Sequence, residues 1–491
     1  MNAHLPILLV VVPLMAAPLA GLARHPRLAW TVAMGATGWS FYAAVALLGR
    51  VRLDGPLTYV LGGWPAPWGI EYRISAINAF VLVIVASIGT VVTPFALRSV
   101  EHEVDADRIP LFYAAYLLCF TGLLGICATG DAFNIYVFLE ISSLSSYVLI
   151  ALGRDRRALT AAYQYLIMGS VGATFILIGI GLLYVLTGTL NVADLGERIQ
   201  ALPSSNTLQV AFTLLTVGFS LKLALFPLHL WLPNAYTLAP SAVSTFLSAT
   251  ATKVAVYMLL VFLFTIFGPA FTFGAMRLDR VLLPLALLGV LVGSAVAIYQ
   301  PNVKRLLAYS SVAQLGYIAA GVSMATVAGL AAGVIHLFNH ALIKGSLFMA
   351  MGAVAYRVGS VRVDAMAGLG RTMPWTMAAF VISGLSLIGV PLTVGFVSKW
   401  LLVRAALESG LWPVAVVVLV GSLLAVAYVW RVVEVAYFTP ARAGVETREA
   451  PLSMLVPVWA LVLANLYFGI NARLTSDVAN EAARQLMGLL P

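Results

Sequence analysis

The stretch His336-Leu-Phe-Asn-His340-Ala-Leu-Ile-Lys344 lies inside a long apolar run from Ala325 to Tyr356. On a helix, residues at positions i, i+4 and i+8 lie nearly on one face, so the two histidines and the lysine form one titratable stripe. A lysine at membrane depth costs roughly 2.5–3.5 kcal/mol on insertion scales. The stretch therefore predicts a membrane helix that carries a proton path. The alternative is that both histidines are core residues with satisfied hydrogen bonds.

The composition of the chain is that of a membrane protein. Of its 491 residues, 62% are hydrophobic and only 10% are charged, and the mean hydropathy is +0.99. A soluble globular protein has no use for so much apolar surface. The two cysteines, Cys119 and Cys127, are eight residues apart in one apolar run, about 12 Å along a helix, which is too far for a disulfide. We therefore expect an all-α polytopic protein in contact with a lipid bilayer.

Apolar runs of roughly 20 residues, the length that crosses a bilayer, predict about fourteen transmembrane helices. The first run has no basic segment before it, so we interpret it as a retained span and not as a cleaved signal peptide. The predicted spans are 5–23, 28–48, 75–97, 110–129, 131–152, 161–187, 208–226, 241–267, 281–299, 305–323, 326–356, 375–403, 411–437 and 451–470.

The loops differ in their content of basic residues. Odd-numbered loops carry fifteen of the 28 Lys and Arg, whereas even-numbered loops and the tail carry nine. Because basic loops stay in the cytoplasm, the odd loops are predicted to be cytoplasmic and both termini outside, in a prokaryotic cytoplasmic membrane. This bias also accounts for the net charge of +9, so the charge does not imply nucleic acid as a partner.

Two of the spans are interrupted. The seventh meets Pro227 and then Pro233, and the twelfth contains Gly389-Val-Pro391. Proline removes a backbone donor, and the carbonyls it frees are tolerated at membrane depth only where protein or water covers them. Broken helices in corresponding positions of two halves are typical of inverted-repeat transporters. The alternative is two unrelated proline kinks.

The positions of two lysines suggest how the halves divide. Lys222 and Lys399 each lie within eight residues of such a proline and are 177 residues apart, which suits two inverted repeats of five spans. The predicted parts are spans 1–3 in residues 1–109, a first repeat (spans 4–8) in 110–268, a second repeat (spans 9–13) in 281–438, and span 14 with a weakly amphipathic surface tail in 451–491.

Lysine and arginine are sorted between two environments. Nearly all of the 23 Arg fall in loops, whereas four of the five Lys fall inside apolar segments. Arginine keeps its proton in proteins, but a buried lysine can release one near neutral pH. The sorting therefore favours proton transfer over lysines that only reach to the membrane surface. We leave out Lys304, which begins span ten and is expected to be an interface anchor.

Glu140 is the one acidic residue well inside a span, and a lone buried carboxylate must stay protonated or meet a cation. Lys222 is the predicted cation, and the alternative is a neutral Glu140 bonded to Ser143 or Ser146. Lys253 follows small hydroxyl residues that could hold water, and its alternative role is a packing lysine bonded to a carbonyl. No nucleophile motif, phosphate loop, metal cluster or cofactor motif occurs, so the chain itself is expected to be a transporter subunit without catalytic or cofactor-binding residues.

Four longer stretches stand out in the chain, namely Asp131-Ala-Phe-Asn-Ile-Tyr-Val-Phe-Leu-Glu140, Ser220-Leu-Lys222-Leu-Ala-Leu-Phe-Pro-Leu-His-Leu-Trp-Leu-Pro233, Lys304-Arg-Leu-Leu-Ala-Tyr-Ser-Ser-Val-Ala-Gln-Leu-Gly-Tyr317 and Asn339-His-Ala-Leu-Ile-Lys-Gly-Ser-Leu-Phe348. They resemble the antiporter-like membrane subunits, which include the D-type subunits of Mrp cation/proton antiporters and the proton-pumping subunits of NADH–quinone oxidoreductases and membrane-bound hydrogenases. The resemblance covers almost the whole chain.

The resemblance implies fourteen core spans, two inverted five-helix repeats and broken helices at spans seven and twelve. It also implies roles for the buried charges. Glu140 and Lys222 would be the coupled pair of the first half, Lys253 would link the halves through His336, His340 and Lys344, and Lys399 would be the terminal proton carrier. The length of 491, without an added C-terminal domain, favours a D-type subunit. One position departs from the typical D-type pattern, because Asn339-His340 stands where a His-Asp pair is expected.

The sequence thus predicts a subunit of a multisubunit Na⁺/proton antiporter that works with other membrane subunits. Its alternatives are a pump module of a redox complex, whose catalytic centres would lie on other subunits, and a structural scaffold whose buried charges serve assembly. The predicted proton path consists of Glu140, Lys222, Lys253, His336, His340, Lys344 and Lys399.

Overall fold

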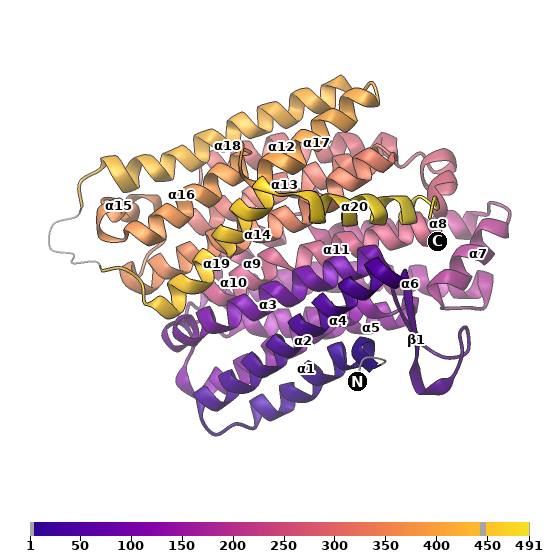
Figure 1. Cartoon of the computed structure of the whole chain (residues 1–491), viewed down its shortest axis with the longest axis horizontal. Helices are drawn as coiled ribbons and strands as arrows, with labels where there is room; N and C mark the ends of the chain where they lie inside the picture. The colour runs from indigo at the N-terminus through magenta and orange to yellow at the C-terminus, as the bar shows by residue number, and fades with distance from the viewer. Residues whose placement is uncertain (1–3, 442–447, 491) are drawn as a thin grey trace.

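Long apolar helices run side by side along the longest axis of the protein (Figure 1). The computed structural model describes residues 4–441 and 448–490. Within them the main α-helices are α1 (Leu5–Gly21), α2 (Pro26–Asp54), α3 (Ala76–Glu103), α4 (Ile109–Ala128), α5 (Ala132–Ala151), α6 (Arg157–Thr187), α7 (Val192–Ala201), α8 (Asn206–Leu223), α9 (Trp231–Leu238), α10 (Ser241–Ala249), α11 (Ala251–Leu260), α12 (Asp279–Ile298), α13 (Val303–Ser323), α14 (Val327–Val358), α15 (Leu369–Thr372), α16 (Pro374–Ile388), α17 (Val394–Glu408), α18 (Trp412–Phe438), α19 (Leu452–Ile470) and α20 (Arg473–Leu486).

Each predicted span coincides with a helix or with a pair of helices. Among the described residues, eleven helical segments are long and apolar enough to cross a membrane, and α1 and α16 are shorter apolar helices. The chain is therefore an all-α polytopic membrane protein, as predicted. The number of fourteen crossings stays a prediction, because the seventh and twelfth spans are each divided between two short helices.

Polar side chains set the starts of several helices. Asp131 accepts a hydrogen bond from the backbone nitrogen of Asn134 and so caps α5. Asn302 caps α13 and Thr326 caps α14 in the same way. Because the first N–H groups of a helix have no partner inside it, these caps fix where each helix begins at the membrane surface.

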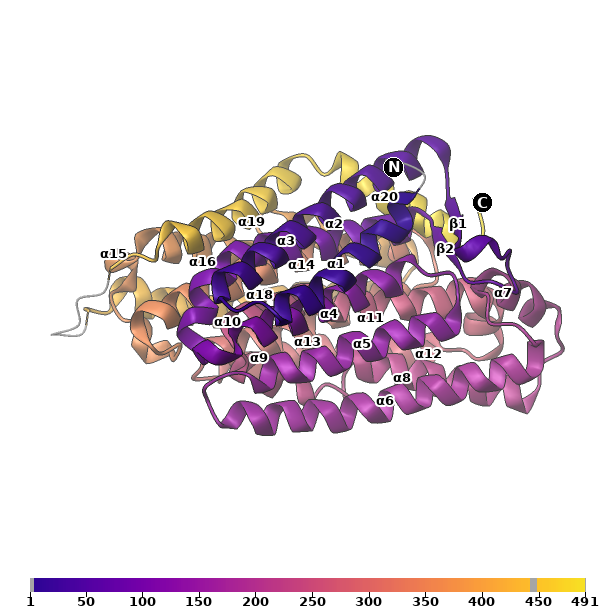
Figure 2. The same ribbon diagram turned by 90° about the horizontal axis from the view of Figure 1, so that it is seen from below.

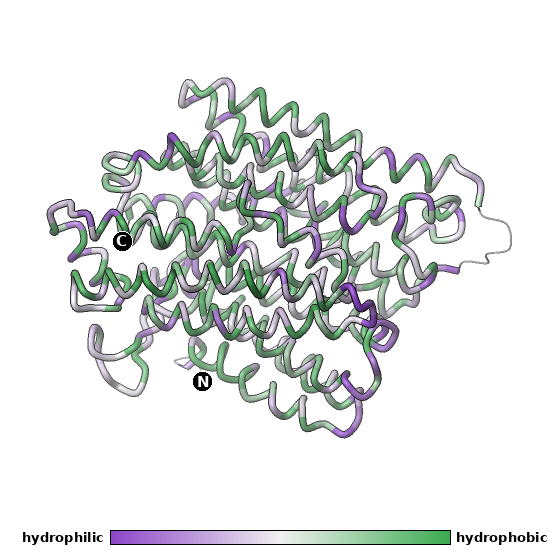
Figure 3. Tube along the Cα trace, turned by 180° about the vertical axis from the view of Figure 1, so that it is seen from behind, coloured by the Kyte–Doolittle hydropathy of each residue, from purple (hydrophilic) through white to green (hydrophobic). Residues whose placement is uncertain are grey.

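Successive helices run in opposite directions, so the loops gather at two ends of the molecule. Figure 1 places both chain termini at the end that also holds the hairpin and α7, whereas α15 lies at the other end. In Figure 3 hydrophilic segments concentrate at the helix ends, and the stretches between them are largely hydrophobic. Loops of odd and of even number thus lie at opposite ends, as the predicted topology requires.

Helix α14 occupies the interior of the bundle. Residues 329–354 of this helix are all buried, including the whole stretch from His336 to Lys344. In Figure 2, α5, α6 and α8 lie along one edge of the molecule and α2 and α19 towards the other, with α14 between them. The helix packs against α3, α10, α13, α16, α17, α19 and α20.

Both predicted breaks are present. Helix α8 ends at Leu223, where Ala224 adopts a left-handed backbone with φ 58°, and α9 begins only at Trp231. Helix α16 ends at Ile388, Gly389 has φ 97° and Leu392 has φ 72°, and α17 begins at Val394. Residues other than glycine rarely adopt positive φ, so the surrounding packing must hold Ala224 and Leu392 in place.

The hairpin near the N-terminal helices and the shape of the eighth span differ from the prediction. Strands β1 (Leu57–Val60) and β2 (Glu71–Ile74) form an unpredicted antiparallel hairpin, whose four-residue strands are too short for a clear periodic pattern. The eighth span is not one regular helix, because α10 and α11 meet at a kink at Thr250 and a π-helix, η4 (Val261–Ile266), follows α11.

The tail is more amphipathic than predicted. Helix α20 packs its apolar face against α3 and α14, and its polar residues Arg473 and Asp477 stay exposed at the surface. Small alanines let this helix approach the bundle closely, and the residues buried on this face are Thr475, Val478, Ala479, Ala482, Ala483 and Leu486.

Candidate functional site

Glu140 and Lys222 lie beside each other on α5 and α8. The Glu140 Oε1 to Lys222 Nζ distance is 3.9 Å, and Lys222 also donates a hydrogen bond of 2.8 Å to the Ser143 hydroxyl. Lys222 is buried in the last turn of α8, where the carbonyl end of the helix favours a positive charge. The predicted pairing of this glutamate with this lysine is thus geometrically available, and Ser143 offers the ammonium a second partner.

The Glu140 side chain lies at the edge of an uncovered surface. It is 29% exposed, and its Oε1 atom has no hydrogen-bond partner among the described residues. The neighbouring face of α5 exposes large apolar side chains, namely Phe133, Val137, Leu144 and Val148. An ionisable group at membrane depth seldom faces lipid, so this face suits contact with another protein better than contact with lipid.

A small cavity connects the surroundings of Lys222 with helix α11. It has a volume of about 20 Å³, room for a water molecule. Its polar lining comes from α5 and α8, and Ala251, Val254, Ala255 and Met258 of α11 form the facing wall. This is the space between the Glu140–Lys222 pair and the helix that carries Lys253.

Lys253 is held by the kink between α10 and α11. The Thr250 hydroxyl donates to the Phe246 carbonyl one turn back, a bond that tends to bend helices, and Thr250 itself leaves helical geometry. The kink frees the carbonyl of Ser248, to which the buried Lys253 ammonium donates. The Lys253 ammonium also lies 3.4 Å from the Thr252 hydroxyl, so both a carbonyl and a hydroxyl contact it, and its role in proton transfer stays a prediction.

Lys253 donates to Ser248 of α10, a helix that packs against α14. Lys253, His336, His340 and Lys344 are all buried inside the bundle. The rings of His336 and His340 are nearly parallel, with an interplanar angle of 7° and centroids 6.1 Å apart. The i, i+4 spacing read from the sequence therefore does place both rings on one face.

The two histidines have different partners. His336 Nε2 is 2.9 Å from Oε1 of Gln314 on α13, and His336 Nδ1 is 2.8 Å from the Ser398 hydroxyl on α17. Since an amide oxygen only accepts, Nε2 carries the proton and Nδ1 accepts from the serine when the ring is neutral. His340 is fully buried, and neither of its ring nitrogens has a partner among the described residues.

Lys344 is the last residue of the stripe on α14, and Lys399 lies on α17, near the His336 end of the stripe. Lys344 donates to the Leu307 carbonyl at 2.7 Å and to the Ser310 hydroxyl, both on α13. Lys399 donates to the carbonyls of Leu387 and Ile388 at 2.9 and 3.0 Å. These two carbonyls end α16, so the break in the twelfth span is what provides oxygen partners for the Lys399 ammonium.

Two further contacts join Lys399 to the rest of the site. Its Nζ atom is 3.0 Å from the Ser422 hydroxyl and lies 4.9 Å from the ring centre of Tyr317. Its neighbour in sequence, Ser398, bonds His336. The seven predicted residues thus form three groups: Glu140 with Lys222, Lys253 with the α14 stripe, and Lys399, which is linked to the stripe through Ser398.

Lys304 differs from the interface anchor that the sequence predicted. Its side chain is 5% exposed, and its Nζ atom is 3.4 Å from the Ala239 carbonyl. It lies at the floor of a charged cavity of about 680 Å³ at the odd-loop end, together with Glu103, Arg154 and Asp155. Its position directly after Pro301-Asn302 suggested a site at the membrane interface, but neighbouring loops cover the first turn of α13.

Sequence reasoning did not single out several uncharged partners. Gln314, Ser398, Ser310, Ser422 and Asn339 all bond the predicted residues or the broken helix, and the Asn339 amide donates to the carbonyl of Val394, the first residue of α17. Gln314 could have been found, because a buried amide in an apolar span needs partners. Serines are too common in membrane helices for their presence alone to mark them.

No group of three or more His, Cys, Asp or Glu within residues 4–441 and 448–490 is arranged to hold a metal ion. Cys119 and Cys127 are both buried and free.

The chain matches a family model described as NADH:quinone oxidoreductase/Mrp antiporter, transmembrane, over residues 129–425. It is similar to the N-type subunit of the NADH-quinone oxidoreductase of Desulforudis audaxviator, with 41% identity over 98% of this chain and 99% of the relative. It is also similar to the D-type subunit of the Na⁺/H⁺ antiporter of Bacillus subtilis, with 32% identity over 90% of this chain and 88% of the relative.

A solved structure has the same fold over nearly the full length. One chain of the Mrp complex from Dietzia sp. superimposes with a TM-score of 0.90 at 27% identity, covering 99% of this chain and 97% of that one. The broken helices and the buried lysines described above lie within the range matched by the family model. The chain therefore belongs to the NADH:quinone oxidoreductase/Mrp antiporter transmembrane family.

Proposed function

We propose that this chain is the proton-translocating subunit of a multisubunit Na⁺/proton antiporter in a prokaryotic cytoplasmic membrane. The observation that carries the proposal is the set of lysine and histidine side chains buried inside the bundle, namely Lys222, Lys253, His336, His340, Lys344 and Lys399. In particular, His340 is buried without a partner among the described residues, on the same face of α14 as His336 and Lys344. A buried histidine without a hydrogen-bond partner lowers the stability of the fold, so packing alone does not explain it. A role in binding a passing proton or water molecule does explain it.

The proposed proton path runs through Glu140, Lys222, Lys253, His336, His340, Lys344 and Lys399. Each lysine has oxygen partners that it can keep whether it is charged or neutral, so protons can move between neighbours at a small difference in free energy. Lys222 has two competing partners, Glu140 and Ser143. When the ammonium lies against the carboxylate its proton is held, and when it turns to the serine the proton can leave towards the small cavity beside α11.

We infer that the halves of the path belong to two inverted repeats, residues 110–268 and 281–438, preceded by spans 1–3 in 1–109 and followed by 451–491. Support comes from the two breaks. In each, one residue other than glycine has positive φ, and a buried lysine touches the carbonyl end of the half-helix or belongs to it. In this arrangement the odd loops face the cytoplasm and both termini lie outside.

The proposal includes that this chain assembles with other membrane subunits. The partly exposed Glu140 on the apolar face of α5 supports it, because a neighbouring subunit would cover this carboxylate. The similar Bacillus subtilis and Dietzia proteins also carry names of a subunit and of a complex.

A second candidate is the proton-pumping membrane subunit of a redox complex. The 41% identity to the N-type subunit of a NADH-quinone oxidoreductase favours it, as does Asn339, which anchors α17 where a typical D-type subunit has histidine. The path is the same in both candidates. They differ in what drives it, a Na⁺ gradient in the first and electron transfer in the second.

The proposed path is tested by Glu140→Ala and Lys399→Ala in inverted membrane vesicles that carry the whole complex. Both variants should abolish cation-driven proton flux, because each removes one end of the row, while the complex still assembles. Arg404→Ala and Glu408→Ala are the matched controls, since these residues form an exposed ion pair on α17, the helix of Lys399, and should transport normally. Wild-type flux in Glu140→Ala and Lys399→Ala would refute the path.

The same vesicles separate the two candidates. Proton movement driven by added Na⁺ without an electron donor supports the antiporter. Proton movement that requires a donor and an acceptor of electrons supports the redox complex.

A further inference from the structure

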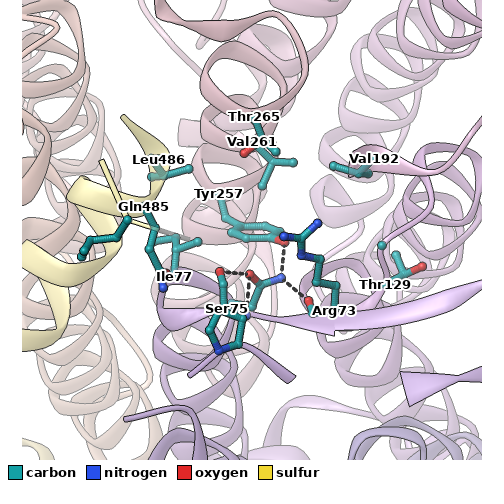
Figure 4. A pocket seen from close by; sticks show the side chains of 14 residues that line it. Arg73, Ser75, Ile77, Thr129, Val192, Tyr257, Val261, Thr265, Gln485 and Leu486 are labelled. Carbon is teal, nitrogen blue, oxygen red and sulfur yellow. Dashed lines mark hydrogen bonds between the residues drawn. The ribbon is translucent and has the colours of Figure 1, made fainter. Parts of the chain in front are cut away.

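A cavity with both polar and apolar lining residues lies at the even-loop end of the molecule, away from the charged cavity of Lys304. Its volume is about 260 Å³, room for several water molecules. Figure 4 shows Arg73 of the hairpin, Tyr257 of α11, Thr265 of η4 and Gln485 of α20 around it. Since Arg73 and Leu490 are exposed at its rim, the cavity communicates with the surface at this end.

Tyr257 forms the inner wall of this cavity, and Lys253 lies one helical turn further inside. Both belong to α11, and residues four apart lie on the same face at about 6 Å separation along the axis. The ring of Tyr257 is 1% exposed. Tyr257 is therefore the cavity-lining residue of α11 that is nearest in sequence to Lys253.

The π-helix extends this face to the rim of the cavity. Tyr257, Val261 and Thr265 are spaced by four and all line the cavity. In an α-helix, a step of four residues is slightly more than one full turn, so successive positions rotate around the axis in one direction. In a π-helix, whose turn contains more residues, the same step is slightly less than one turn, so the rotation has the opposite direction. Because η4 begins at Val261, the two rotations compensate, and Thr265 stays on the face of Tyr257 and Lys253.

The hydroxyl of Tyr257 is placed to pass on a proton. Its oxygen is 2.8 Å from the Asn78 amide nitrogen, which also contacts the carbonyls of Arg73 and Cys127. An amide nitrogen has two hydrogens, here shared among three oxygens, and accepts none, so the phenol keeps its own O–H for an acceptor on the cavity side. The Asn78 oxygen is in turn bound to Ser75, which fixes the amide orientation.

The charge of the cavity discriminates between ions. Among the described residues that line it, Arg73 is the one with an ionised side chain. Arginine stays protonated, so its side chain gives the cavity a permanent positive charge, and none of the described lining residues carries a carboxylate side chain. This charge repels Na⁺, whereas a proton moves by exchange between water and Tyr257 and needs no cation-binding site.

We propose that this cavity is the outer proton port of the chain, with Tyr257 as the relay between its water and Lys253 and with Arg73 as the group that keeps Na⁺ out. The proposal rests on the proposed function, because it gives that path an opening to the outer surface at Lys253. It assigns Tyr257 and Arg73, which lie outside the row of buried lysines and histidines.

The relay is tested by Tyr257→Phe, which keeps the ring and removes the hydroxyl. In vesicles with the whole complex, proton flux should fall by about a hundredfold or more, as expected when one partner of a transfer step is lost. Tyr59→Phe is the matched control, because Tyr59 lies in the hairpin at the same end and bonds His4 outside the cavity. Wild-type flux in Tyr257→Phe overturns the relay, and if Lys399→Ala is inactive in the same preparation, the proposed path itself survives.

The charge barrier is tested by labelling. In a background with Cys119 and Cys127 replaced by alanine, Thr265→Cys should react with an anionic, membrane-impermeant thiol reagent several times faster than with a cationic one of similar size. Adding Arg73→Gln should abolish this preference and leave the labelled position accessible. Equal rates for the two reagents before that change overturn the role of Arg73, and protection of Thr265→Cys from both reagents on both sides of the membrane overturns the port.

Discussion

The two histidines of α14 are one turn apart, but their surroundings are opposite. His336 has a partner on each ring nitrogen, whereas His340 has none among the described residues. A buried polar group that loses its partner costs about 1–3 kcal/mol, and a group that never had one pays this cost in the native state. His336 therefore contributes to the stability of the fold, whereas His340 lowers it.

This contrast makes a prediction that separates packing from transport. His336→Leu should lower the thermal unfolding midpoint of the purified complex, because Gln314 and Ser398 lose their partner, at a cost of about 1–3 kcal/mol. His340→Leu should leave the midpoint unchanged or raise it, since an apolar side chain of similar size removes an unsatisfied ring.

Both variants should lose proton flux in vesicles. Equal shifts of the midpoint in the two variants would show that water or a partner subunit satisfies His340 as fully as Gln314 and Ser398 satisfy His336.

At the scale of elements, the break between α16 and α17 is built for Lys399. Gly389 has φ 97°, and a methyl group added there would lie 3.0 Å from Cδ of Lys399 and 3.8 Å from its Nζ. The glycine thus serves two purposes, since it permits the left-handed turn and it leaves room for the lysine stem against the end of α16. The exposed carbonyls of Leu387 and Ile388 then meet the ammonium.

Gly389→Ala should therefore harm transport more than stability alone explains. The backbone cost of a side chain at positive φ is about 1–2 kcal/mol. Gly410→Ala is the matched control, because Gly410 has φ 71° and nothing within 4 Å of the added methyl group.

We expect similar losses of thermal stability in the two glycine variants, but a clear loss of proton flux only in Gly389→Ala. Equal flux in both would mean that Lys399 tolerates a shift of its stem.

At the scale of the whole molecule, the two ends differ in charge and in access. The odd-loop end holds the large cavity with Lys304, Glu103 and Arg154, and the even-loop end holds the smaller cavity with Arg73. The lysine and histidine row lies between them in the bundle. Such an arrangement allows the central groups to exchange protons with one side at a time, without an open pore.

The orientation of the molecule is tested with single cysteines. Ser204 lies in an exposed even loop and Thr439 in an exposed odd loop. In a background without Cys119 and Cys127, an impermeant maleimide added to intact cells should label Ser204→Cys, and labelling of Thr439→Cys should require inverted vesicles.

The opposite pattern would invert the predicted topology, because the excess of basic residues that fixes it is moderate. Labelling of both positions from one side would contradict the helix directions of the structure.

The sequence by itself determined the class of fold, the approximate positions of the helices and the breaks in two of them. These features follow from local chemistry, since apolar length decides membrane crossing and proline or glycine decides where a helix stops. It also identified Glu140, Lys222, Lys253, the α14 stripe and Lys399, because an ionisable residue in an apolar run is conspicuous wherever it folds.

Only the tertiary structure decided what each of these groups touches. Nothing local to His336 and His340 tells them apart, because Gln314 and Ser398 reach only the first of them, from other helices. The burial of Lys304 and the amphipathic face of α20 were also not predicted. Whether these side chains are buried depends on loops and helices that lie far away along the chain. The partners of a buried charge are set by packing between distant segments, and a single sequence does not encode that packing in any local pattern.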